Sequence, residues 1–348
     1  MDPLASALPV RHGETRFSDV EVRSYSLPLK DGDTFLGDLA SGSEFRKVLR
    51  RERHRIDATG HPPFGSDRTH ELTGDDLDAA LRERNSTAEG RVIENAIGAF
   101  SQRFAAVLAE FLETAEWRGT QRVVCGGGLM EGDVGAELVR RTQSRLRVDR
   151  PDLELRRLHH APDEAGMIGW TVAAPAGALE AGEAFVAVDI GGTNVRWGIV
   201  RSAHWKDGPR SASVIRHDKW CHAEEDVSRE AVVERIAKGI RGMVRHAQSN
   251  GIRLAPLVGL SCPGIVCSDG RLARGGQNLP GDWSDGEFEL PKAIAAEVGA
   301  IAGRRPAVVL HNDAVVQALS ELTEMRDVER WAAVTLGTGL GNCSFQNH

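Results

Sequence analysis

The residues best suited to chemistry begin with an acid in front of a glycine turn. Asp189 belongs to an apolar, strand-like run that leads into Gly191 and Gly192. Glycines let backbone N–H groups approach an anion closely, and a carboxylate can hold a hydrated Mg²⁺. A tight hairpin with glycine at positive φ is the alternative for this segment by itself. The candidate phosphate-binding residues are Asp189, Gly191, Gly192, Thr193, Asn194 and Arg196, with Asp189 also holding Mg²⁺ through water.

Two further glycine turns follow strand-like runs, at residues 337–339 and 126–128. Neither is a dinucleotide fingerprint, because Asn342 and Glu131 stand where the last glycine is needed, and the sequence contains no P-loop motif. Each turn alone is compatible with a plain connection. Three turns after three strands, with an acid in the first, predict a divided phosphate clamp. Its further residues are Gly337, Thr338, Gly339, Gly126, Gly127 and Gly128.

A second acid, Asp313, follows the apolar run 307–310 and directly precedes a helical segment. An acid at the carboxyl end of a strand lies at the edge where α/β sheets bind ligands. There, Asp313 can accept the proton of a hydroxyl that attacks a phosphoryl group. The alternative role is an N-cap of the helix, which is compatible with the first.

Two loops carry groups suited to a polyol. Residues 261–264 end a strand in a Pro-Gly turn formed by Pro263 and Gly264. Residues 277–283 offer the amide of Asn278 beside an aromatic ring. Amide groups next to an apolar surface suit the alternating hydroxyls and C–H faces of a sugar. An ordinary turn covered by a buried Trp is the equal alternative.

The elements that position these residues alternate between strands and helices. Strands are expected near 185–189, 195–200, 211–217, 257–261, 307–311 and 331–336, with helices at 229–248 and 314–325. In the first half we expect helices at 44–56, 87–116 and 133–145, and strands at 21–29, 122–125 and 153–158. This alternation predicts an α/β fold. Residues 173–184 are rich in Ala and Gly and have the composition of a linker.

Composition excludes several classes of function. The 348 residues carry a net charge of -7, which disfavours a nucleic-acid partner. The sequence has no apolar stretch of about 18–20 residues, so we expect no membrane association. Its five cysteines form no CxxC pair, so we expect reduced thiols, no zinc site and a cytoplasmic location.

Five of these segments together resemble the sugar kinases of the ROK family (repressors, open reading frames and kinases) in the actin–hexokinase superfamily. They occur in the order typical of the family and cover nearly all of residues 185–341. The segments are VAVDIGGTNVRWGIV (186–200), GLSCPGIV (259–266), QNLPGDW (277–283), VVLHNDAVVQALSE (308–321) and TLGTGLG (335–341).

Three more segments resemble the family but stand in an unusual position. VVCGGGLMEGD (123–133) is similar to the adenosine motif, and HHAPDEAGMIGW (159–170) is similar to the segment after it. LPVRHGETRF (8–17) faintly resembles the sugar-binding GExGH segment. In the family these follow the fifth motif, whereas here they precede the first. The resemblance therefore implies a circular permutation, with residues 173–184 joining the old ends. A fusion of halves from two kinases, completed by a second chain, is the alternative.

The resemblance implies an actin/hexokinase-type α/β fold, with two RNase H-like lobes around a central cleft and the motif order permuted. Residues 1–172 would form the main part of the back lobe, 173–184 the linker and 185–310 the front lobe. Residues 311–348 would begin the back lobe.

The implied function is ATP-dependent phosphorylation of a hexose, with glucose at its 6-hydroxyl as the first choice. Asp313 would be the general base, Asp189 would position Mg²⁺, and the glycine turns would hold ATP. The sugar-binding residues would be Asn278, Asn312, Asp313, Glu14, Pro263 and Gly264. Mannose, an N-acetylhexosamine or another hexose remain alternative substrates, and polyphosphate an alternative donor. A non-catalytic sugar sensor and an actin-like ATPase are alternatives from other classes.

Departures from the family limit what the resemblance implies. The Cys-rich zinc motif is absent, which agrees with the expectation of no zinc. Phe17 replaces the histidine of the GExGH segment, so His12 would be at best a substitute. Prolines early in the chain leave little room for the helix-turn-helix of the family's repressors. A homodimer is the family's usual assembly.

Overall fold

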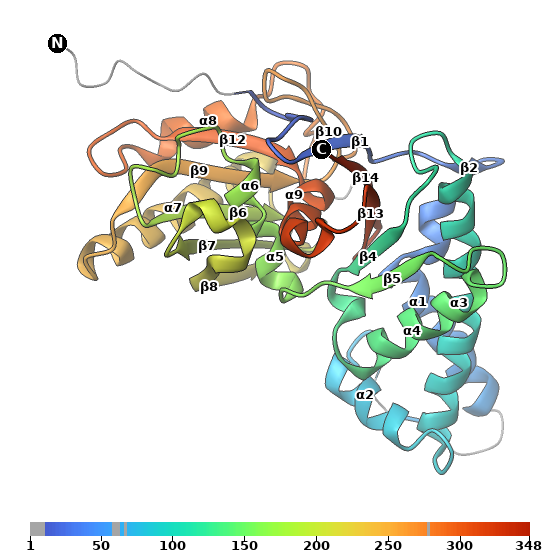
Figure 1. The fold of residues 1–348 in the computed structure, drawn as a ribbon. Coiled ribbons are helices and arrows are strands. Elements are labelled where there is room, and N and C mark those ends of the chain that lie inside the picture. The colour runs from blue at the N-terminus through green and yellow to red at the C-terminus, as the bar shows by residue number, and fades with distance from the viewer. Residues whose placement is uncertain (1–10, 58–62, 66–67, 277–278) are drawn as a thin grey trace. The chain divides into compact units, whose positions relative to one another are not determined.

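The computed structural model describes residues 11–57, 63–65, 68–276 and 279–348. It divides into two compact units, each built from segments that are far apart in the sequence (Figure 1). Of the described residues, unit 1 comprises 11–26, 163–276, 279–327 and 347–348, and unit 2 comprises 27–57, 63–65, 68–162 and 328–346. Residues 11–26, 163–172 and 311–327, which we expected with the back lobe, thus belong to the same compact unit as residues 185–276 and 279–310.

Unit 1 is built on a five-stranded sheet with the strand order β12-β9-β6-β7-β8. The five strands of this sheet are β6 (Ala184–Ile190), β7 (Asn194–Ser202), β8 (Ala212–Cys221), β9 (Leu254–Cys262) and β12 (Ala307–Asn312). The residues of unit 1 also include β1 (Val20–Tyr25), β10 (Ile265–Val266) and β11 (Leu272–Arg274), which lie outside this sheet. Its helices are α5 (Pro162–Ile168), α6 (Trp170–Ala173), α7 (Arg229–Ser249), α8 (Leu290–Val298) and α9 (Asp313–Leu319), with short 3₁₀ turns at Trp205–Ser211, His222–Glu224 and Leu322–Met325.

The two faces of this sheet differ in chemistry because side chains alternate along each strand. In β6, Val186 and Val188 belong to the apolar core, together with residues of α7 and α8. Ala187 and Asp189 therefore point to the opposite face. On that face α5 and α6 pack closely: a Cβ atom added to Gly259 of β9 would lie 2.3 Å from the ring of Trp170.

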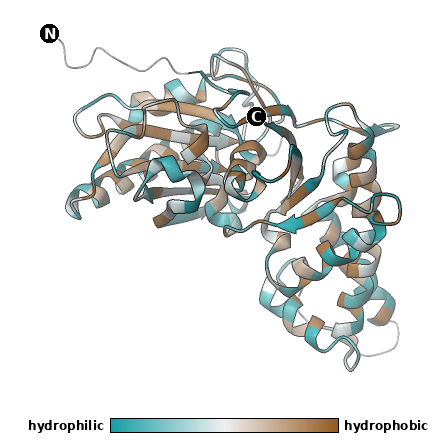
Figure 2. Ribbon diagram, in the orientation of Figure 1, coloured by the Kyte–Doolittle hydropathy of each residue, from teal (hydrophilic) through white to brown (hydrophobic). Residues whose placement is uncertain are grey.

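Unit 2 combines a second sheet with a group of helices. Its strands are β2 (Lys30–Asp31), β3 (Thr34–Phe35), β4 (Arg122–Gly126), β5 (Glu154–Arg157), β13 (Arg330–Leu336) and β14 (Leu340–Asn347). Its helices are α1 (Gly42–Asp57), α2 (Gly74–Arg82), α3 (Ala88–Glu113) and α4 (Gly132–Leu146), with 3₁₀ turns at Leu36–Ala40 and Gly128–Met130. Stretches of brown and teal alternate along these helices in Figure 2, as expected for helices with one buried face.

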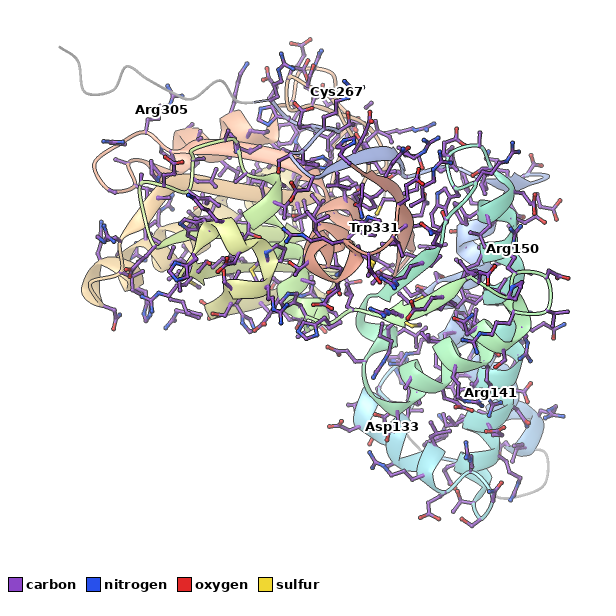
Figure 3. The ribbon with its side chains drawn as sticks, in the orientation of Figure 1. Asp133, Arg141, Arg150, Cys267, Arg305 and Trp331 are labelled. Carbon is purple, nitrogen blue, oxygen red and sulfur yellow. The ribbon has the colours of Figure 1, made fainter. Side chains whose placement is uncertain are left out.

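The core of unit 2 is separate from that of unit 1. One side of α3 is buried, with Phe100, Phe104 and Leu108 fully inaccessible. At its polar boundary, Arg141 of α4 (labelled in Figure 3) donates to Glu137 and Glu94 over 2.7 and 2.6 Å. The pair with Glu94 joins α4 to α3, whereas Glu137 belongs to α4 itself.

Four strands of unit 1 and four strands of unit 2 are paired in the same pattern of antiparallel and parallel neighbours. In unit 1, β7 and β6 form an antiparallel pair, and β9 and β12 continue the sheet in parallel. In unit 2, β14 and β13 form the antiparallel pair, and β4 and β5 continue in parallel. The hairpin precedes the parallel strands in the sequence of unit 1 but follows them in unit 2.

The sequence predicted most of these elements, with three corrections. The expected strand 21–29 ends at Tyr25, because Ser26 adopts a positive φ of 49°. The expected helix 314–325 ends at Leu319, and a 3₁₀ turn follows. The expected linker 173–184 is partly buried, since Leu179 is 7% exposed and Ala184 begins β6. Within the described part of the chain, no helix is both long and apolar enough to cross a membrane.

Candidate active site

The sheet register of unit 1 brings several predicted residues to neighbouring positions. Asp189 of β6 is opposite Ser261 of β9, and Ser261 is opposite His311 of β12. Strand β12 ends at Asn312, and Asp313 is the next residue and the first of α9. The predicted acids therefore both belong to the carboxyl-terminal end of one sheet, where α/β folds bind ligands.

Asp313 is half-buried and does not cap its helix, which corrects the alternative role considered above. Asn312 is the N-cap, because its side-chain oxygen accepts a hydrogen bond from the Val315 N–H over 3.1 Å. Asp313 Oδ1 accepts from the Ala314 N–H over 2.8 Å. Burial and the nearby charge of Asp189 together raise the pKa of Asp313 to about 7. A carboxyl group with this pKa can accept a proton near neutral pH.

Asp189 is 8% exposed and lies beneath α5. Burial raises the pKa of its carboxyl group, and Arg196 opposes this rise with an Nη1–Oδ2 distance of 3.5 Å. A Cβ atom on Gly166 of α5 would lie 2.7 Å from Asp189 Cγ. Only glycine therefore lets α5 approach the carboxyl group so closely.

Arg196 has a partner that sequence reasoning missed. Its Nε donates to Asp163 Oδ1 over 2.5 Å, and Lys219 Nζ donates to Asp163 Oδ2 over 3.1 Å. Asp163 was visible in the segment 159–170 only as an unassigned acid. The guanidinium of Arg196 is thus held between two carboxylates, Asp163 and Asp189.

The turn after β6 is held by a second residue that the sequence did not reveal. The Gly191 N–H donates to the Asn194 carbonyl over 2.8 Å and closes the turn. His222 Nε2 lies 2.9 Å from the Gly191 carbonyl, and since a carbonyl only accepts, Nε2 carries the proton. The Ala223 N–H donates to the Thr193 carbonyl over 3.3 Å. These two bonds fix the carbonyl side of the predicted phosphate-binding turn.

The predicted sugar-binding residues are only partly brought together. Asn312 is 1% exposed, and its Nδ2 donates to the Gly264 carbonyl over 3.0 Å and to Ser26 Oγ over 3.3 Å. These bonds tie the Pro263–Gly264 turn to the start of α9, so Asn312 has a structural task. Asn278 lies outside the described residues.

Glu14 lies beside the end of β12 through its backbone, as the Gly13 N–H donates to the Leu310 carbonyl over 3.0 Å. Its carboxylate Oε1 accepts from the N–H groups of Thr15 and Arg16 over 3.1 and 3.3 Å. His12, considered a substitute ligand, accepts the Leu310 N–H at Nδ1 over 3.1 Å. This bond gives His12 a structural task.

The other two glycine turns meet in unit 2. Thr335 of β13 pairs with Gly126 of β4, so the turns that follow these strands are neighbours. Gly127 has a φ of 88°, and a Cβ atom there would lie 2.5 Å from the Leu336 carbonyl oxygen. The Gly337 N–H donates to the Gly339 carbonyl over 3.0 Å and closes the second turn.

The start of α1 also joins these turns, which the sequence did not predict. The Gly42 N–H donates to the Gly337 carbonyl over 2.9 Å, and Ser43 Oγ donates to the Thr338 carbonyl over 2.8 Å. The residues around Asp189 and Asp313 thus form one cluster in unit 1, and the two glycine turns form another in unit 2.

The residues around Asp189 fit a hydrated Mg²⁺. Burial raises the pKa of both acids, and Arg196 opposes the rise only at Asp189. Carboxylate oxygen is also the donor type that Mg²⁺ prefers. Across the described residues, no three or more His, Cys, Asp or Glu side chains are grouped to hold a metal. A metal here would therefore depend on water and substrate for most of its ligands.

Comparison with known proteins assigns the second half of the chain. Residues 185–348 match the model of the ROK family. We call these matched residues the ROK segment. The ROK segment supplies Asp189, Arg196, Asp313 and the turn 337–339. Glu14, Asp163 and the turn 126–128 lie outside the matched residues.

Among solved structures, a ROK family glucokinase from Streptomyces griseus in complex with glucose and AMPPNP is 24% identical, with a TM-score of 0.33. The match covers 46% of this chain and 43% of the glucokinase, so the chain spans less than half of that protein's length. A PPX-GPPA enzyme from Aquifex aeolicus is 12% identical, with a TM-score of 0.22, and 38% of this chain and 36% of that chain are covered. No curated protein matches the chain. The assignment therefore depends on the family match of the ROK segment.

Proposed function

We propose that this protein is a sugar kinase that transfers the γ-phosphoryl group of ATP to a hexose hydroxyl. The observation that carries the proposal is that Asp313 and Asp189, both in the ROK segment, lie at the carboxyl-terminal end of the same sheet. The pKa of about 7 at Asp313 suits a general base. The glycine turn after Asp189 suits a phosphate.

In the proposed reaction the sugar hydroxyl oxygen attacks the γ-phosphorus. A new O–P bond forms while the bond to the β,γ-bridging oxygen breaks and ADP leaves. The hydroxyl proton passes to the carboxylate of Asp313. Phosphoryl transfer is mainly positioning and charge neutralisation, so the precise placement of Asp313 by α9 supports this role.

The remaining residues are assigned to binding. Backbone N–H groups of the turns at 191–194 and 337–339 would hold phosphates, and the turn at 126–128 would accompany the nucleotide. Asp189 would hold Mg²⁺ through water, and the ion would neutralise charge on the phosphates. Since Arg196 is held by Asp163, we assign it to balancing the charge of Asp189 as well as to binding phosphate.

We propose glucose, at its 6-hydroxyl, as the first substrate to test. Mannose and N-acetylhexosamines offer the same pattern of hydroxyls to amide and carboxylate groups, so they are tested beside it. Glu14 and Asn278 are the proposed sugar contacts, and the Pro263–Gly264 turn would line the same site.

The test is ADP release from MgATP with a panel of hexoses, comparing the natural protein with Asp313→Ala. The matched control is Asp218→Ala, since Asp218 is an exposed acid of unit 1 on β8. We expect turnover with one hexose, a loss of about 10³-fold or more in kcat for Asp313→Ala, and little change for the control.

Two results would contradict the proposal. Turnover of Asp313→Ala within a few-fold of the natural protein would show that Asp313 is not the base. Sugar binding without ADP release, from either ATP or polyphosphate, would favour a sugar sensor.

We further propose that the chain is a circular permutant of the ROK order. The strand arrangement supports this, because the hairpin β13–β14 of unit 2 combines with the earlier strands β4 and β5. In unit 1 the corresponding hairpin comes first. One chain thus supplies all four strands of this pattern in each sheet. This favours permutation over two half-kinases completed by a second chain.

A reordered chain tests this proposal. His348 would be joined to Met1, and the chain opened between the exposed residues Ala176 and Gly177. We expect the reordered protein to fold, to have the same turnover as the original order, and to form an assembly of the same mass in solution. Activity that requires a dimer in both orders would instead support completion by a second chain.

A further inference from the structure

His311 is a buried polar residue next to the proposed base, and the mechanism above does not use it. It belongs to β12, the edge strand of the sheet in unit 1, and is 2% exposed. Its position opposite Ser261 places it on the sheet face that also carries Asp189. Its neighbours along the chain are Asn312 and then Asp313.

Both ring nitrogens of His311 form hydrogen bonds, and these bonds are compatible with only one protonation state of the ring. Nδ1 accepts the Asn312 N–H over 2.7 Å, and Nε2 donates to the Glu14 carbonyl over 2.7 Å. A backbone N–H can only donate and a carbonyl can only accept, so the ring is neutral with its proton on Nε2. Burial lowers the pKa of His311 to about 4, in agreement with this neutral form.

These bonds connect β12 with residues 12–14, which lie outside the ROK segment. Two hydrogen bonds of the Leu310 backbone, from the Gly13 N–H and to the side-chain Nδ1 of His12, lie beside the His311 bond and hold the segment along β12. The rings of Phe17 and Tyr25 lie 6.2 and 5.9 Å from the His311 ring. Since β12 is an edge strand, this segment covers a side of the sheet that is otherwise free for pairing.

The carboxylate of Glu14 is held close to the Glu14 carbonyl that His311 binds. Its Oε1 accepts the N–H groups of Thr15 and Arg16, so the side chain folds over the backbone that follows the anchored carbonyl. A shift of the Glu14 carbonyl therefore moves the carboxylate with it.

We propose that His311 is a positioning residue that holds Glu14 in register with Asn312 and Asp313, and thereby controls affinity for the sugar. This inference depends on the proposed function, in which Glu14 contacts the sugar. His311 itself touches neither sugar nor nucleotide.

The first measurement is the dissociation constant of the sugar, by calorimetry without nucleotide, for the natural protein, His311→Phe and His311→Gln. Phe keeps the ring volume but removes both hydrogen bonds, whereas Gln retains a donor and an acceptor. We expect His311→Phe to weaken sugar binding by about tenfold or more and Gln to weaken it less. The KM for MgATP should stay within about twofold, a separation that a general loss of structure does not produce.

A double-mutant cycle with Glu14→Ala tests the route of the effect. If His311 acts through Glu14, adding His311→Phe to Glu14→Ala should weaken sugar binding by less than about twofold more. The matched control is His217→Phe, since His217 is an exposed histidine of the same unit on β8, and its sugar affinity should be unchanged.

Hydrogen exchange provides a readout that needs no sugar. The Gly13 amide should exchange faster in His311→Phe than in the natural protein, while amides of α7 should not change. Unchanged exchange at Gly13, or unchanged sugar affinity in a folded His311→Phe protein, would overturn the inference alone. If the natural protein binds no hexose, the proposed function and this inference both fail.

Discussion

Replacing Asp313 with Asn should make the protein more stable at alkaline pH while it abolishes turnover. The unfolded carboxyl has a pKa of 3.8, and the folded environment raises it to about 7. An acid whose pKa is raised on folding contributes its full stability below the unfolded pKa. That contribution is lost as the pH rises from 3.8 through about 7. An Asn at this position does not ionise and avoids the loss.

The size of the effect follows from the shift. A shift of about 3 pKa units, at about 1.4 kcal/mol per unit, corresponds to about 4 kcal/mol at pH 8 as an upper limit. At pH 5 the same two pKa values give about 2 kcal/mol, so the advantage of Asn should grow by roughly 2–3 kcal/mol between pH 5 and pH 8.

The assay is urea unfolding at pH 5, 6, 7 and 8, in EDTA and without nucleotide, for the natural protein and Asp313→Asn. The control is Asp218→Asn on the exposed face of β8, which measures the effect of removing an exposed acid of the same unit under the same conditions. An Asp313→Asn advantage that stays constant or shrinks from pH 5 to pH 8 would refute the argument. It would mean that the folded protein does not disfavour the carboxylate.

Three further variants test individual contacts. His222→Leu removes the bond to the Gly191 carbonyl and should raise the KM for MgATP about tenfold with little change in the KM for sugar, measured by steady-state kinetics; equal changes in both would contradict a role at the phosphate-binding turn. Gly166→Ala places a methyl group against Asp189 and should cost about 1–3 kcal/mol in urea unfolding, together with a lower kcat; an unchanged midpoint would show that α5 can move away. Thr87→Ala removes the side-chain N-cap of α3 and should cost about 1 kcal/mol with kcat unchanged, whereas a change in kcat would implicate α3 in catalysis.

Elements whose patterns are strong and local could be predicted from the sequence alone. The long helix α3 was predicted over 87–116, and the buried strands β6 and β9 were predicted as well. The Gly-rich turns and the motif around Asp313 identified the ROK segment before the fold was known. Turns and strand ends depend on a few adjacent residues, so their signal is contained in short stretches.

The helices α2 and α8 and the strand β14 were not predicted, because their patterns are short or weak. Helix α8 begins at Leu290 with a Pro at its second position, and its apolar positions become a clear face only beside α7 and β12. Local preference is too small to define such elements, and packing decides them.

The residues that hold the predicted site could be identified only from the tertiary structure. Asp163, His222 and His311 lie far in sequence from the residues they hold, at Arg196, Gly191 and Glu14, and no local pattern connects them. The pKa of Asp313 is likewise a tertiary property, since it results from burial and from a second acid on another strand. Sequence therefore determined the groups available for chemistry. Their partners, ionisation and orientation required the three-dimensional fold, because electrostatic and hydrogen-bond interactions depend on distance in space rather than along the chain.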